Sequence, residues 1–90
     1  MELFVLKPCR TGREFDLRPK RKMELDLKDA ATRLARAGFV VELATPLVLF
    51  LRFGEVKLAL YRSGHVLVRG AGSAQVAEDI GRRLFSLLTG

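Results

Sequence analysis

The chain contains very few of the residues that build cross-links, metal centres and catalytic relays. It has one cysteine, Cys9, and one histidine, His65. A single cysteine cannot form an internal disulfide, and one cysteine with one histidine cannot complete a tetrahedral zinc site. No serine, cysteine or carboxylate lies at a sequence spacing from His65 that implies a relay. We therefore expect a metal-free, non-enzymatic protein without a cofactor.

Long apolar runs are also missing. No stretch approaches the ~20 apolar residues of a membrane span, and the opening MELFVLKPCR has too short an apolar run for a secretory signal. We expect a soluble, cytoplasmic protein with no membrane contact. The hydrophobic content of 49% is typical of a compact globular chain. Residues 1–90 are expected to form a single domain, and its small size favours a homodimer.

Negative charge is scarce in the segments where positive charge gathers. The net charge is +6; residues 1–22 carry seven Lys or Arg against three Asp or Glu, and residues 46–71 carry four against one. A surface of this kind suits an anionic partner such as nucleic acid, although it also suits a merely solubilising role.

The first half of the chain predicts a strand, a loop and a helix. Residues 2–7 alternate as a strand would, and Pro8 ends the run. Residues 9–22 have no clean period and finish in RPKRK, so we expect an exposed basic loop, with room for a bent strand at residues 14–18. Asp26 is a good N-cap for a helix that ends at Gly38.

The second half predicts an antiparallel meander followed by a long helix. Four apolar runs are separated by turn residues. A three-residue turn at residues 63–65 places Val66 and Val68 inward and Leu67 and Arg69 outward, whereas a two-residue turn would reverse these faces. We favour the longer turn because it keeps the arginines out of the core. The runs are residues 39–43, 47–53, 56–61 and 66–69.

The final helix begins after Ser73 and ends at Gly90. One stripe of it is apolar. The predicted fold class is α+β in the order β-α-β-β-β-β-α, a curved antiparallel sheet with the helices on one face and the other face open. The stripe comprises Val76, Ala77, Ile80, Leu84, Leu87 and Leu88.

The stretch RGAGS at residues 69–73 begins like a phosphate-binding fingerprint. Its third glycine is absent, and the preceding strand belongs to a hairpin, not to a βαβ unit. We interpret Gly70 and Gly72 as turn residues and Ser73 as a helix cap.

The element order and certain residues resemble one repeat of the TATA-box-binding protein family. The likeness runs from LDLK at residues 25–28 through ALYRSGHVLVRGAGS at residues 59–73 into the final helix. The resemblance implies a half-saddle, completed by a homodimer, whose open sheet face contacts DNA in a transcription-related role. It does not extend to the phenylalanine wedges of that family, because those positions fall near Pro46 and at Tyr61 or Arg62. The basic segment at residues 10–22 has no counterpart there.

Two surfaces are candidates for binding nucleic acid, either DNA or RNA. The outward residues of the predicted sheet interleave aromatic and basic side chains, which suits base stacking with phosphate contact. The same face suits a protein interface equally well, since an open apolar sheet must be covered. The candidate residues of the sheet are Phe50, Arg52, Lys57, Tyr61 and Arg69, and those of the loop are Arg10, Arg13, Arg18, Lys20, Arg21 and Lys22.

The basic loop also has interpretations that do not involve nucleic acid. It could be a solvated segment, or its arginines could bind a small anionic ligand. Glu14 and Asp16 within it are most simply partners for neighbouring arginines. The alternative function for the whole chain is a protein-interaction or assembly module that uses the open sheet face without nucleic acid.

Overall fold

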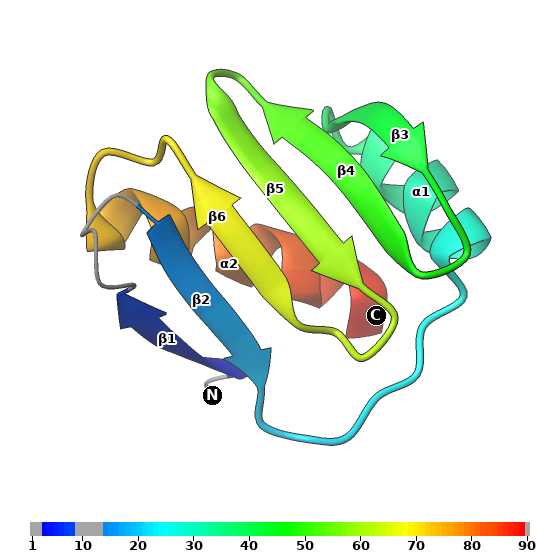
Figure 1. Ribbon diagram of the computed structural model, residues 1–90, viewed down its shortest axis with the longest axis horizontal. Helices are drawn as coiled ribbons and strands as arrows, with labels where there is room; N and C mark the ends of the chain where they lie inside the picture. The colour runs from blue at the N-terminus through cyan, green and yellow to red at the C-terminus, as the bar shows by residue number, and fades with distance from the viewer. Residues whose placement is uncertain (1–2, 9–13, 90) are drawn as a thin grey trace.

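The computed structural model describes residues 3–8 and 14–89, apart from the side chain of residue 89. Within these residues the fold is α+β, with the element order β-β-α-β-β-β-β-α (Figure 1). The elements are β1 (Phe4–Pro8), β2 (Glu14–Pro19), α1 (Leu27–Arg36), β3 (Val40–Ala44), β4 (Val48–Phe53), β5 (Val56–Tyr61), β6 (Val66–Arg69) and α2 (Ala74–Thr89).

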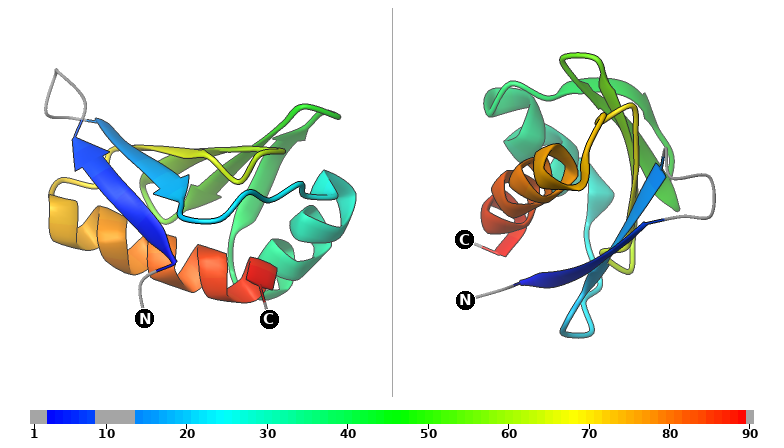
Figure 2. Two further views of the ribbon diagram at one scale, coloured as in Figure 1. Left: turned by 90° about the horizontal axis from the view of Figure 1, so that it is seen from below. Right: turned by 90° about the vertical axis from the view of Figure 1, so that its left-hand side faces the viewer.

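The described strands form one antiparallel sheet in the order β1-β2-β6-β5-β4-β3. Helices α1 and α2 cover one face of this curved sheet, and no described element covers the other (Figure 2). The predicted layering, with the helices on one side and an open sheet face, is therefore confirmed.

The strand β2 corrects the prediction that residues 9–22 form one exposed loop. Within EFDLR, Phe15 and Leu17 are buried and alternate with the outward Glu14, Asp16 and Arg18. This period of two suits a half-buried strand, and β2 pairs with both β1 and β6. The bent strand that the sequence allowed here is thus an interior strand of the sheet. Residues 9–13 lie outside the described residues.

Local chemistry sets the ends of α1 as predicted. The Asp26 carboxylate accepts from the backbone N–H of Lys28 at 3.0 Å and of Asp29 at 3.4 Å. These bonds satisfy donors that have no partner inside the helix. The helix closes at Ala37, and Gly38 follows with a φ of 100°, which costs glycine little.

The hairpin between β5 and β6 has the predicted facing. Val66 and Val68 are fully buried, and Leu67 and Arg69 lie on the other side. The turn itself is one residue earlier than expected, because the Tyr61 N–H donates to the His65 carbonyl at 2.9 Å. His65 therefore lies beyond the turn and pairs with Tyr61 across the hairpin.

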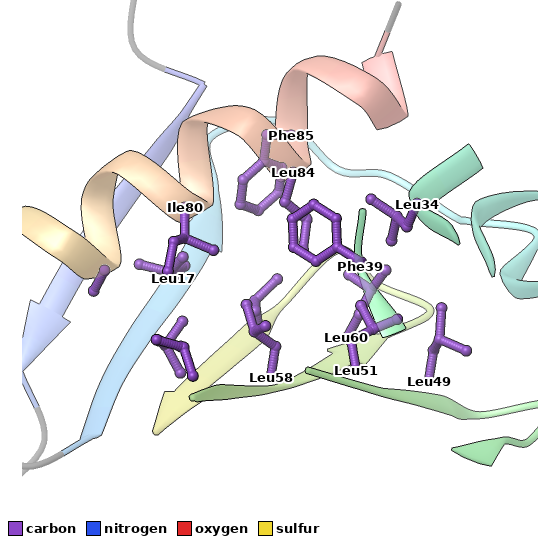
Figure 3. Close-up of a cluster of buried hydrophobic side chains, with 14 of the residues drawn as sticks. Leu17, Leu34, Phe39, Leu49, Leu51, Leu58, Leu60, Ile80, Leu84 and Phe85 are labelled. Carbon is purple, nitrogen blue, oxygen red and sulfur yellow. The ribbon is translucent and has the colours of Figure 1, made fainter. Parts of the chain in front are cut away.

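The core lies between the sheet and the helices (Figure 3). Side chains from α2 meet those of the strands, and Phe85, which the predicted stripe omitted, is fully buried and stacks on Phe4 at 5.0 Å. Val76, predicted to be inward, is 40% exposed. Because the buried stripe is centred on Ala77 and Leu84, Val76 lies beyond its margin at 100° per residue.

Candidate nucleic-acid interface

The sheet face opposite the helices, here called the open face, collects the outward side chains of the strands. Each of these positions alternates with a buried neighbour along its strand. On the central strands the open face comprises Glu14, Asp16 and Arg18 of β2, Leu67 and Arg69 of β6, Lys57, Ala59 and Tyr61 of β5, and Val48, Phe50 and Arg52 of β4.

Basic side chains lie directly opposite one another across β6, β5 and β4. Arg69 is in register with Lys57, and Lys57 is in register with Arg52. We call these residues the cation row. Like charges at directly opposite positions destabilise a sheet, so this row does not arise from pairing preferences.

Carboxylates flank the cation row at both ends. Arg69 Nη2 lies 2.8 Å from Glu14 Oε1, and Arg52 Nε lies 3.6 Å from Glu42 Oε2. Lys57, at the centre, is exposed, and it has no ion-pair partner among the residues that the structure describes. Because Arg69 and Arg52 are each paired with a carboxylate, the positive charge that remains on the row is that of Lys57.

An apolar row runs beside the cation row, one outward position further along the strands. It consists of Leu67, Ala59, Phe50 and Leu43, each in register with the next. Phe50 is 39% exposed and Leu43 is 55% exposed. A line of apolar surface and a line of positive charge thus cross the same strands in parallel.

A hollow of about 260 Å³ opens on this face. Ala59 lies between the larger side chains of Phe50 and Leu67 across the sheet and of Lys57 and Tyr61 along its own strand. The short methyl group leaves space that these neighbours surround. The hollow is lined by Glu14, Phe50, Lys57, Leu58, Ala59, Tyr61, Leu67, Val68 and Arg69.

Sequence reasoning missed a polar cluster between β2 and the residue just before β6. Asp16 Oδ1 accepts a hydrogen bond from His65 Nε2, and Asp16 Oδ2 accepts from Arg18 Nε at 3.1 Å. Since an ionised carboxylate only accepts, Nε2 carries the proton in this pair. Asp16 and His65 are far apart in the chain, and only the pairing of β2 with β6 brings them together. Asp16 is thus a partner for Arg18, as expected, while Glu14 pairs with Arg69 of another strand.

The cluster connects the open face to residues 20–22, which follow β2 and are called the basic loop from here on. The ring of His65 lies 5.7 Å from that of Tyr61, which borders the hollow above Ala59. On its other side, His65 lines a second hollow of about 470 Å³ with Arg18, Lys20, Arg21 and Lys22. The structure thus brings nine of the predicted site residues into adjoining surfaces. Arg10 and Arg13 lie outside the described residues.

The wedge positions of the family resemblance carry no exposed aromatic pair. Pro46 is exposed in the turn between β3 and β4, and Arg62 pairs with Glu24 at 2.5 Å. Tyr61 is half-buried on the open face. No side chain at these positions projects as an exposed phenylalanine.

In comparisons with known proteins, no protein-family model, curated protein or solved structure matches the chain. Among the described residues, no helix has the length and apolar character needed to cross a membrane. The same part of the chain contains no cluster of three or more side chains suited to holding a metal ion.

Proposed function

We propose that this protein binds nucleic acid through its open face, with the basic loop extending the contact surface. The observation that carries the proposal is the parallel course of the cation row and the apolar row. Phosphates are held by Lys and Arg, and bases stack on exposed aromatic rings. The open face offers both groups at neighbouring positions of the same strands.

The charges of the open face support an anionic partner. The cation row keeps like charges opposite one another at a cost in stability, and Lys57 has no neutralising partner in the described residues. A bound phosphate backbone would offset that cost. The exposed Arg21 and Lys22, beside His65, continue the same positive surface.

The element order also supports the proposal. From β2 to α2 the chain follows the order β-α-β-β-β-β-α, which is the order of the TATA-box-binding protein repeat that the sequence resembles. In this interpretation β1 is an addition at the edge of a TBP-like half-saddle, and a homodimer would supply the second half.

A second candidate function is protein assembly through the same face. Its support is the exposure of Val40 and Leu43 on β3, at 44% and 55%, which are in register with Arg52 and Phe50 of β4. Such a patch can serve as a homodimer interface. The two candidates share a surface, so binding and oligomeric state must be measured together.

The proposed function is tested with labelled oligonucleotides, single-stranded and duplex, titrated at increasing KCl. We expect affinity at low salt that falls as salt rises. Lys57→Gln should weaken binding at least fivefold, because it removes the unpaired charge at the centre of the cation row. Lys28 is exposed on α1, which covers the opposite face of the sheet. Lys28→Gln removes the same charge and should change the affinity less than twofold.

Light scattering on the same samples separates the two candidates. A stable dimer that binds neither oligonucleotide at low salt would contradict nucleic-acid binding and favour assembly through the open face.

A further inference from the structure

The hollow above Ala59 is bordered by larger side chains of the neighbouring strands. Adjacent strands lie about 4.8 Å apart, so Phe50 and Leu67, on either side of β5, border a space about two strand spacings wide. Its volume is about 260 Å³. The floor is the Ala59 methyl group with the backbone around it.

The walls of the hollow differ in chemistry from one end to the other. Phe50 and Tyr61 offer aromatic rings, whose faces attract planar groups. Lys57 and Arg69 lie at the other end, where Glu14 Oε1 accepts from Arg69 Nε at 3.0 Å. A ligand that fits both ends has a planar ring and a nearby negative charge, as a nucleotide does.

We infer that this hollow takes a single unpaired base while Lys57 holds an adjacent phosphate, so that the protein selects single-stranded over duplex nucleic acid. The inference rests on the proposed function and names its substrate class. A paired base presents only its groove edge to a protein, and it can enter a walled depression only after leaving the stack. An unpaired base is already free to do so.

The first experiment fills the hollow without changing its charge. Ala59→Leu should weaken binding of a twelve-nucleotide oligothymidylate about tenfold, because a base can no longer stack on Phe50 and Tyr61 in the filled hollow. The slope of affinity against salt should stay unchanged, since no phosphate contact is removed. Ala35→Leu adds the same bulk at an exposed position of α1 and should leave the affinity unaltered.

The second measurement uses the wild-type protein and needs no substitution. The chain has one tyrosine, Tyr61, and no tryptophan, so all of its tyrosine emission comes from a residue that lines the hollow. Saturating oligothymidylate should quench this emission strongly, whereas duplex of matched absorbance should quench it little. A base stacked on Tyr61 is the physical cause of the expected quenching.

The outcomes separate the inference from the proposed function. Equal affinity for duplex and single strand, or an Ala59→Leu protein that binds normally, would overturn the inference and leave nucleic-acid binding standing. A wild-type protein that binds neither form at low salt would overturn both. A wild-type dimer that Ala59→Leu converts to monomers would show that a second copy fills the hollow, and would also overturn the inference.

Discussion

At the scale of single residues, small side chains decide how closely α2 approaches the sheet. A Cβ at Gly81 would lie 2.7 Å from Leu17 Cδ1 and 2.9 Å from Phe4 Cζ. Both are ends of buried side chains packed in the core. Gly81 weakens the helix itself, and its place in the middle of α2 follows from this contact with β1 and β2.

Gly81→Ala is therefore expected to destabilise the protein, although alanine is the better helix former. The added methyl group must push apart Leu17 and Phe4, at a cost of about 1–3 kcal/mol in the free energy of unfolding. Urea denaturation measures this change. Ser86→Ala, at an exposed position of the same helix, should stay within about 0.5 kcal/mol of wild type. Equal stability of both variants would show that the contact at Gly81 relaxes freely.

Asp16 shows how a residue acquires a different role when strands pair. In the sequence it is one acid among several arginines, and His65 is a lone histidine. In the fold the Asp16 carboxylate accepts from both Arg18 and His65, which joins β2 to the residue just before β6. The histidine thereby has a structural partner and borders both candidate surfaces.

At the scale of elements, the cation row opposes sheet stability and serves the proposed contact with phosphate. Lys57 of β5 lies between Arg52 of β4 and Arg69 of β6. Replacing it by an acid would turn a repulsive row into an attractive one, since opposite charges at paired positions stabilise a sheet. The strands then become better partners for one another and worse partners for an anion.

Lys57→Glu is thus expected to change stability and binding in opposite directions. The free energy of unfolding should rise by about 0.5 kcal/mol, while affinity for oligonucleotides should fall below detection at moderate salt. Lys57→Gln should lie between wild type and Lys57→Glu in both measurements. Urea denaturation and fluorescence anisotropy provide the two values. A Lys57→Glu protein that is less stable than wild type would mean that the lysine contributes to the fold, not to a ligand site.

At the scale of the whole molecule, two groups of basic side chains lie next to each other. The open face and the basic loop adjoin at His65, and Arg21 and Lys22 are exposed there. Neither side chain has an ion-pair or hydrogen-bond partner among the described residues. A polyanion lying on the open face can therefore reach this loop.

The double variant Arg21→Gln/Lys22→Gln should reduce the salt dependence of binding. If each side chain contacts one phosphate of a single strand, the slope of log affinity against log salt should become less steep by about 1.4. Affinities measured from low to high KCl give this slope. Lys28→Gln/Arg36→Gln removes the same charge from exposed α1 and should leave the slope unchanged. An identical slope in both double variants would exclude the loop from the contact.

Periodicity and turn chemistry allowed much of the fold to be predicted, because they act over a few neighbouring residues. The cap at Asp26, the end of α1 before Gly38 and the bounds of β5 and β6 follow from local signals, and the structure confirms them. The strand β2 is harder to predict from the sequence, because EFDLR is short and its charged residues obscure the alternation of Phe15 and Leu17.

Alternation along β4, β5 and β6 predicts from the sequence which residues point outward, because side chains alternate along any strand. Which of these residues are neighbours across the sheet follows from the tertiary structure. Register between separate strands aligned Arg69, Lys57 and Arg52 in one row and placed Ala59 among larger side chains. That alignment depends on pairing between distant segments, which no local pattern of residues records.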